Sequence, residues 1–122
     1  MVLTAKSTSE GFETIYQNSA FKCAFISPSV QYRFGKVSLL KRHNDTDEVF
    51  VLLSGKAVLL TRDGDGPYER TPLQPNTAYN VTKGTWHHLA VSDDALVFVT
   101  ESGSLLPQNT ESIQIVEENI VV

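Results

Sequence analysis

The side chains best suited to chemistry in this sequence lie in two separate clusters. The first contains Lys41, His43 and Glu48, and the second contains His87. Two imidazoles and one carboxylate form a ligand set typical of open Fe, Mn, Ni or Zn centres. The same groups can also exchange protons with a bound metabolite. If the fold brings the two clusters together, His43, Glu48 and His87 are candidate metal ligands, and His87, Glu48 and Lys41 are candidate catalytic residues.

The first cluster is positioned by two predicted strands that are joined by a turn. Side chains of a strand alternate between its two faces, so Lys41 and His43 share one face. By the same alternation Glu48 points inward together with Phe50, and a buried carboxylate is costly unless it is paired. We therefore expect Glu48 to lie within hydrogen-bonding or metal distance of His43, His87 or Lys41.

Two aromatic residues near the second cluster are predicted to bind substrate. Trp86 directly precedes His87, and Tyr79 shares a strand face with Val81. Their rings and polar groups can contact a ligand at the mouth of a barrel, although such residues also serve as packing residues. His88 is expected on the strand face opposite to His87.

The rest of the chain reads as short strands separated by turns. Runs of β-branched, aliphatic and aromatic residues alternate with clusters of Gly, Pro, Asn and Asp, which is typical of a β-sandwich or barrel. No long segment keeps a helical apolar period. We expect strands over residues 12–16, 21–26, 37–42, 48–53, 56–62, 68–71, 77–81, 87–91 and 95–101. Residues 112–122 are expected to form a late strand on this barrel or on a partner subunit.

Composition limits the function classes. The 122 residues are 41% hydrophobic and 20% charged, as in an ordinary globular protein, and we expect one domain over residues 1–122. The net charge of −4 argues against a nucleic-acid partner, because such binding depends on basic residues. No apolar run is long enough for a membrane span, and no secretory h-region follows Met1. We therefore expect a cytoplasmic protein without nucleic-acid or membrane partners.

The first cluster resembles the first motif of the cupin superfamily. That motif is a glycine, five residues, His-x-His, three or four residues, Glu, six residues and a glycine. Gly35, Lys41, His43, Glu48 and Gly55 occupy these positions, with Lys41 in place of the first histidine. The resemblance implies an all-β fold, namely the jelly-roll barrel, or double-stranded β-helix, of the cupins.

The second cupin motif is only partly kept. Gly84 and His87 have the family residue types, whereas Asn76, Thr82 and Val91 depart from them. Cupins host dioxygenases, isomerases, epimerases, lyases, sugar binders and proteins without activity. The resemblance therefore indicates the fold much more specifically than it indicates a reaction.

The substitution at Lys41 bears directly on metal binding. The resemblance implies that His43, Glu48 and His87 keep three of the four metal-binding positions, while a protonated Lys41 removes a ligand and repels a divalent cation. Three interpretations compete. The site holds Zn, Ni, Mn or Fe through three ligands, or it is metal-free with an ion pair between Lys41 and Glu48, or it is a polar core that binds nothing.

Function is predicted at the level of ligand class. We interpret the chain as a small-molecule-binding cupin barrel whose ligand is a polar or anionic metabolite, since cations cluster before the first motif. If it is an enzyme, we expect a metal-dependent lyase, isomerase or dioxygenase. The alternative is a non-catalytic, metal-free binding or sensing module. A further alternative is a ureidoglycolate lyase-like enzyme, because residues 79–113 resemble the corresponding part of ureidoglycolate lyases.

The C-terminal residues suggest self-association. Apolar side chains are concentrated there and require cover, as do the exposed sheet edges of a small barrel. We therefore predict a homodimer. The apolar residues concerned are Ile113, Ile115, Ile120, Val121 and Val122.

Overall fold

The structure, a computed structural model, describes residues 1–104, 109–115 and 120–122. The named elements of these residues are strands, as the sequence predicts, and Asn109 has 3₁₀ conformation directly before the last of them. No helix in this described part is long and apolar enough to cross a membrane. The strands are β1 (Gly11–Gln17), β2 (Lys22–Ser27), β3 (Leu39–His43), β4 (Glu48–Ser54), β5 (Ala57–Arg62), β6 (Glu69–Pro72), β7 (Ala78–Val81), β8 (Trp86–Val91), β9 (Leu96–Glu101) and β10 (Thr110–Gln114).

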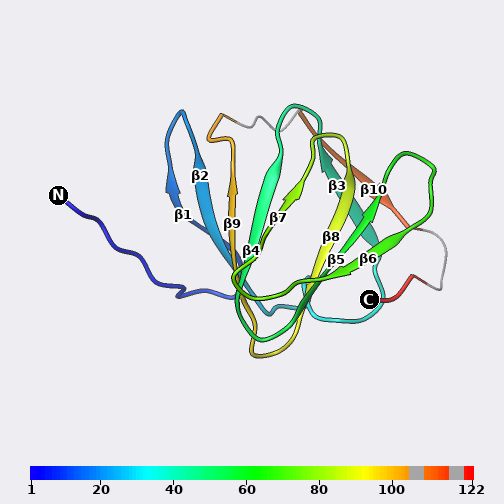
Figure 1. The fold of residues 1–122 in the computed structure, drawn as a ribbon, viewed down its shortest axis with the longest axis horizontal. Coiled ribbons are helices and arrows are strands. Elements are labelled where there is room, and N and C mark those ends of the chain that lie inside the picture. Colours follow the sequence, from blue (N-terminus) through cyan, green and yellow to red (C-terminus); the bar gives the residue numbers. More distant parts are fainter. Residues whose placement is uncertain (105–108, 116–119) are drawn as a thin grey trace.

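The strands form two antiparallel sheets of five strands each (Figure 1). One sheet has the order β1-β2-β9-β4-β7, and the other has the order β10-β3-β8-β5-β6. Consecutive strands β1 and β2 pair within one sheet and β5 and β6 within the other, whereas β3 and β4 belong to different layers. The predicted all-β jelly-roll fold is confirmed. The strand observed near the C-terminus, β10, begins two residues before the predicted late strand at 112–122 and pairs with β3 of its own chain, where Thr110 lies opposite His43. Residues 116–119 of that prediction lie outside the described residues.

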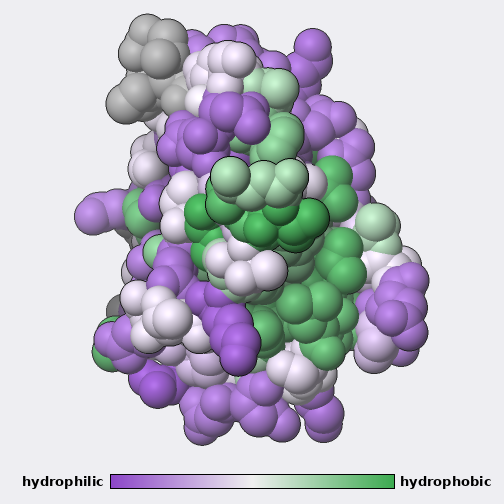
Figure 2. Space-filling model, turned by 90° about the vertical axis from the view of Figure 1, so that its left-hand side faces the viewer, coloured by the Kyte–Doolittle hydropathy of each residue, from purple (hydrophilic) through white to green (hydrophobic). Residues whose placement is uncertain are grey.

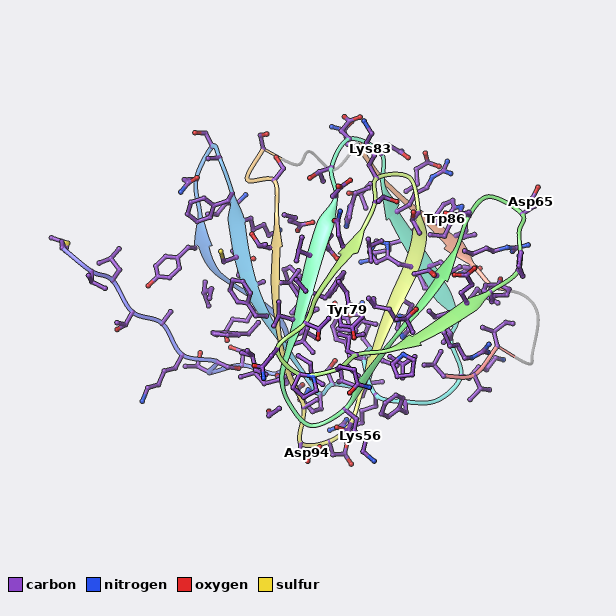
Figure 3. The ribbon with its side chains drawn as sticks, in the orientation of Figure 1. Lys56, Asp65, Tyr79, Lys83, Trp86 and Asp94 are labelled. Atoms are coloured by element: carbon purple, nitrogen blue, oxygen red, sulfur yellow. The ribbon has the colours of Figure 1, made fainter. Side chains whose placement is uncertain are left out.

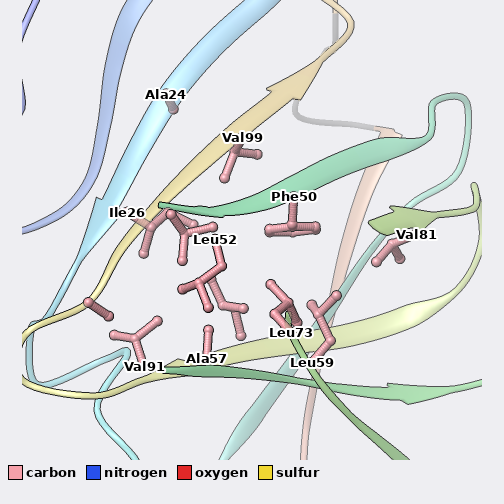
Figure 4. Packing of buried hydrophobic residues seen from close by; sticks show 13 residues of the cluster. Ala24, Ile26, Phe50, Leu52, Ala57, Leu59, Leu73, Val81, Val91 and Val99 are labelled. Atoms are coloured by element: carbon pink, nitrogen blue, oxygen red, sulfur yellow. The ribbon is translucent and has the colours of Figure 1, made fainter. Parts of the chain in front are cut away.

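The main hydrophobic core lies between the two sheets (Figure 4). Phe50 and Leu52 of β4, Leu59 of β5 and Val97 and Val99 of β9 contribute to it, each at most 3% exposed. Burying a side chain of this size contributes roughly 1.5–3 kcal/mol. Because alternate residues face the core, the strand positions in phase with these residues also point inward.

A second buried cluster covers the outer face of the β3-β8-β5 region. Leu60 and Trp86 belong to this cluster, whereas their strand neighbours Leu59 and His87 face inward. Figure 3 labels Trp86 on β8. Among the C-terminal residues, Ile115 is 8% exposed in this cluster, and Ile120 and Val122 pack against it. Several of the C-terminal apolar side chains that were expected to require a partner subunit are therefore packed against residues of their own chain.

Gly55 forms a tight turn that joins β4 of one sheet to β5 of the other. Its φ of +71° lies in the left-handed region, and a Cβ there would lie 2.6 Å from Cα of Ala95. Only glycine fits this turn between β4 and β5 without displacing the backbone. The turn that the sequence predicts at this position is confirmed.

Candidate functional site

Three predicted metal ligands converge inside the barrel although they come from both sheets. Nε2 of His43 on β3 lies 3.1 Å from Oε2 of Glu48 on β4, and Nε2 of His87 on β8 lies 3.5 Å from Oε1 of the same carboxylate. One ligand atom from each residue lies within 4.8 Å of the others. Glu48 is 6% exposed and His87 is 8% exposed, so the predicted inward orientation of Glu48 is observed.

Hydrogen bonds at the far ring nitrogens orient both imidazoles. Nδ1 of His43 lies 3.0 Å from Oγ1 of Thr110, which stands opposite it on β10. Nδ1 of His87 lies 3.0 Å from the backbone carbonyl oxygen of Thr85. Such partners fix the ring orientation and turn Nε2 toward the site, as metal-binding histidines require.

The donor set fits a divalent cation. A carbonyl oxygen only accepts hydrogen bonds, so we assign the proton of a neutral His87 to Nδ1. Its Nε2 then presents a lone pair to a carboxylate oxygen of Glu48. Two electron-pair donors that face each other at this distance call for a proton or a metal ion between them. The residues present therefore fit a metal ion.

Lys41 lines the same cavity as His43, so the predicted common face of these two residues is observed. Lys41 also lies opposite His87 in the register of β3 and β8. No ion pair joins Lys41 to Glu48 in the described part of the chain, where Glu48 is held by the two imidazoles instead.

Sequence reasoning missed a second carboxylate in the site. Glu101 ends β9, lies opposite Glu48 in the register of β9 and β4, and is 8% exposed. Its Oε2 lies 3.6 Å from Nε2 of His43, and its Oε1 lies 3.5 Å from Nζ of Lys22. The signal was present, because Glu101 continues the inward phase of Val97 and Val99.

Burial and neighbouring charge separate the pKa values of the two carboxyls. Burial, together with a hydrogen bond and charge repulsion from Glu48, raises the pKa of Glu101 to about 8, although Lys22 opposes the shift. Burial also acts to raise the pKa of Glu48, but hydrogen bonds from His43 and His87 outweigh it and hold that pKa well below its ordinary value. Glu48 is thus the ionised member of the pair near neutral pH, and a protonated Glu101 can donate to it.

A cavity of about 850 Å³ opens onto these groups. Apolar side chains form much of its wall, among them Ile26, Phe50 and Leu89. Three lysines from β2, β3 and the segment between them also line it, and they are Lys22, Lys36 and Lys41. The cavity therefore combines an apolar wall and cationic groups with a carboxylate-imidazole cluster.

Tyr32 and His88 also line this cavity, on the segment between β2 and β3 and on β8 respectively. Their rings are stacked, with centroids 6.5 Å apart. Burial, followed by the charges of Glu48 and Glu101, raises the pKa of Tyr32 to about 12. Burial, followed by the charge of His87, lowers the pKa of His88 to about 4. Both residues are therefore neutral near pH 7.

A turn residue connects the two motifs. Oδ1 of Asp47 accepts a hydrogen bond from the backbone N–H of Lys83 at 2.8 Å, and Oδ2 accepts one from the side-chain amide of Asn80 at 3.0 Å. The hydrogen bond from Asn80, followed by that from Lys83, lowers the pKa of Asp47. The turn before Glu48 is thereby tied to the turn before His87.

Neither predicted substrate-binding aromatic residue lines the large cavity. Trp86 alternates with His87 on β8 and is therefore buried in the outer cluster, beneath the guanidinium of Arg42 at 4.4 Å from the ring centroid. Tyr79 packs against the main core, and its hydroxyl accepts a hydrogen bond from the backbone N–H of Gln74 at 2.8 Å (Figure 3). Neither ring therefore lines the large cavity, whereas Tyr79 lines a separate cavity of about 250 Å³, and substrate binding by these two residues stays a prediction.

No family model and no curated protein sequence matches this chain. Solved structures are similar to it in fold. A cupin-2 domain protein from Shewanella frigidimarina gives a TM-score of 0.58 at 20% identity, covering 80% of this chain and 84% of that chain. The TDP-quinovose 3,4-ketoisomerase WlaRB from Campylobacter jejuni gives 0.59 at 19% identity, covering 72% of this chain and 66% of that chain.

A third similar structure is oxalate decarboxylase from Bacillus subtilis, with a TM-score of 0.61 at 19% identity. The match covers 88% of this chain and 29% of that chain. Nothing in these likenesses bears on the resemblance of residues 79–113 to ureidoglycolate lyases, which stays a prediction. At such identities the likeness concerns the fold, and it agrees with the two sheets described above: the chain has the cupin fold.

Proposed function

We propose that this chain binds a divalent metal ion through His43, Glu48 and His87 and uses the centre to bind and transform a small anionic metabolite. The observation that carries the proposal is the convergence of the three ligand atoms within 4.8 Å at the wall of a cavity of about 850 Å³. Oxalate decarboxylase from Bacillus subtilis, which is similar in fold, has Mn(II) centres.

The metal, when bound, would act as a Lewis acid toward an oxygen of the substrate. The other roles belong to side chains of this chain. Lys41 supplies a positive charge that attracts and orients a carboxylate or another anionic group. Glu48 keeps both imidazoles turned into the site, and Thr110 and Thr85 hold them from behind. The apolar wall excludes water from the non-reacting part of the ligand.

The charge of the cavity supports an anionic ligand. Lys22, Lys36 and Lys41 reach the cavity wall from neighbouring segments. Lys22 already contacts Glu101, whereas no described residue forms an ion pair with Lys41. A ligand carboxylate would supply that pair.

A second candidate function is a metal-free binding or sensing module. It is favoured by one observation, namely that Glu48 already bridges both imidazoles and that a proton can take the place of the metal between them. In this case the cavity would hold the same anionic ligand without transforming it. A lyase reaction of the ureidoglycolate type is retained as one possible reaction of the first candidate.

Metal analysis of purified protein without a histidine tag tests the first candidate. We expect close to one equivalent of Mn, Fe, Ni or Zn, and loss of that metal in His87→Ala. A protein that carries no metal and takes up none from added Mn²⁺, Ni²⁺ or Zn²⁺ contradicts it and leaves the second candidate. A thermal-shift screen of small carboxylates then identifies the ligand, with Lys41→Met as the variant that should lose the shift and Lys56→Met as its surface control.

We further propose that the protein acts in the cytoplasm, where a lone cysteine such as Cys23 remains reduced.

A further inference from the structure

We propose that Glu101 is a fourth metal ligand, so that the donor lost from β3 at Lys41 is replaced by a carboxylate from β9. This inference rests on the proposed metal site and extends it. The centre would then hold its ion through His43 and His87 as imidazoles and through Glu48 and Glu101 as carboxylates.

The first argument is position. Glu101 lies opposite Glu48 in the register of β9 and β4, and both side chains face inward. Oε2 of Glu101 lies 3.6 Å from Nε2 of His43, which itself lies 3.1 Å from Glu48. A small shift of one carboxylate is enough to place both oxygens around an ion that His43 binds.

The second argument concerns the burial and hydrogen bonding of Oε2 of Glu101. The side chain of Glu101 is 4% exposed, and its Oε2 is a buried atom without a hydrogen-bond partner among the described residues. Buried polar atoms in folded proteins are generally satisfied, so this oxygen, which faces Nε2 of His43, needs either a proton shared with Glu48 or a cation that the two carboxylates and His43 bind together. Lys22 contacts the other oxygen, Oε1, and leaves Oε2 available.

The third argument is charge. Two neutral imidazoles and two carboxylates carry a net charge of two negative units, which one divalent ion neutralises. With only three ligands, Glu101 would stay beside Glu48 without the cation and would have to keep a proton to avoid charge repulsion, whereas coordination to the ion replaces that proton. Two carboxylates with two imidazoles also suit Mn²⁺ or Fe²⁺ better than the softer ions that thiolates select.

Calorimetric titration of the untagged, metal-stripped protein with Mn²⁺ tests the inference. We expect one site in the wild type and at least about tenfold weaker binding in Glu101→Gln, which keeps the shape and loses the charge; this equals ~1.4 kcal/mol. Glu69→Gln removes an exposed carboxylate on β6 that does not line the cavity, and its affinity should stay within about twofold of the wild type.

A second variant gives an effect of opposite sign. Lys22→Met removes the cation that competes for Glu101, and we expect it to tighten Mn²⁺ binding. Relief of charge repulsion alone would tighten binding similarly in Lys36→Met, which removes another cavity lysine that forms no ion pair with Glu101 in the described residues, so the gain in Lys22→Met should exceed that in Lys36→Met. Visible absorption of the Co²⁺-loaded proteins supplies an independent reading, because the loss of a carboxylate ligand in Glu101→Gln changes the d–d bands.

The outcomes separate the two proposals. Equal affinity and equal Co²⁺ spectra in wild type and Glu101→Gln overturn the role of Glu101 and leave the three-ligand site intact. Absence of Mn²⁺ and Co²⁺ binding in the wild type overturns both. If Glu101→Gln does not fold, Lys22→Met decides, since unchanged or weaker binding in that variant contradicts the inference.

Discussion

Glu101 and Glu48 stand opposite each other on adjacent antiparallel strands, and both are buried on the inner face. Their carboxyls come from segments that are distant in the sequence and share one small space with two imidazoles. Without a metal ion, two negative charges at this place oppose each other, so the pair holds a proton more readily than an isolated carboxyl does.

The first prediction concerns the pH dependence of the metal-free protein. The pKa of Glu101 is raised from 4.5 to about 8 in the folded state. The folded protein therefore binds this proton more tightly than the unfolded chain does. The stabilisation is complete below about pH 4.5 and is lost as the pH rises toward and through about 8.

Glu101→Gln, which imitates the protonated carboxyl, should remove this pH dependence. With a chelator present, the urea midpoint of the wild type should decrease relative to that of the variant as the pH is raised from 6 to 9. Parallel curves for the two proteins would contradict the raised pKa.

The second prediction concerns Lys41. Lys41→His replaces a positive charge on the cavity wall with a neutral donor two residues from His43. We expect at least about tenfold tighter binding of Ni²⁺, Zn²⁺ or Mn²⁺ at pH 7.5, equivalent to ~1.4 kcal/mol. The gain should fade below pH 6, where imidazole is protonated and cannot coordinate. Calorimetry decides, with Lys56→His as a surface control, and equal affinities would mean that position 41 does not reach the metal.

The third prediction separates Trp86 from the site. Because Trp86 is 7% exposed in the outer cluster, Trp86→Phe should lower the free energy of unfolding by about 1–2 kcal/mol through lost packing. Metal and ligand affinities should stay within about twofold of the wild type. A selective loss of ligand affinity with unchanged stability would restore the predicted substrate-binding role.

The fourth prediction concerns His88. Its pKa is lowered from 6.5 to about 4, so the folded protein excludes a proton that the unfolded chain accepts. This contribution to stability is present above about pH 6.5 and is lost as the pH falls toward 4. Between pH 7 and pH 5, the free energy of unfolding should therefore decrease less in His88→Gln than in the wild type, by an amount on the order of 2 kcal/mol. Chemical denaturation at pH 5 and pH 7 measures it, and an unchanged slope in the variant would disprove the assignment.

Local alternation was sufficient for much of the site. It predicted that Lys41 and His43 share a face and that Glu48 points inward with Phe50, because a strand has a strict period of two whatever its partners are. The same rule places Trp86 and His87 on opposite faces of the strand. It was not applied to Trp86, because the strand was expected to begin one residue later, at His87. β8 begins at Trp86.

Glu101 illustrates what local pattern does not provide. The sequence predicts a strand over residues 95–101 that ends at Glu101, but the importance of this residue depends on the pairing of β9 with β4, which are separated by four intervening strands in the sequence. Register between distant strands is decided by packing of the whole barrel. The partner of Tyr79 was missed for a different reason: the N–H of Gln74, five residues earlier, reaches its hydroxyl through a local turn, and strand alternation does not describe turns.

The fifth prediction is the homodimer. Several large apolar side chains of the described residues are exposed, including Leu53 at 51%, Phe12 at 37% and Phe21 at 43%. Figure 2 views the side of the molecule on which β1 and the N-terminal segment lie, and apolar residues gather there in one area. Light scattering at tens of micromolar should give twice the chain mass of 13.5 kDa. A particle of 13.5 kDa would contradict the dimer.

The pairing of β10 with β3 also has a consequence for the nascent chain. Thr110, which contacts Nδ1 of His43, follows it by 67 residues. At roughly 5–20 residues per second, synthesis leaves that edge of β3 without its partner for about 3–13 s. An exposed strand edge pairs readily with other chains, and charged side chains suppress such pairing. We therefore expect Lys41 and Arg42 to protect the growing polypeptide from aggregation, so that Lys41→Val and Arg42→Val increase the insoluble fraction in pulse-labelled cells.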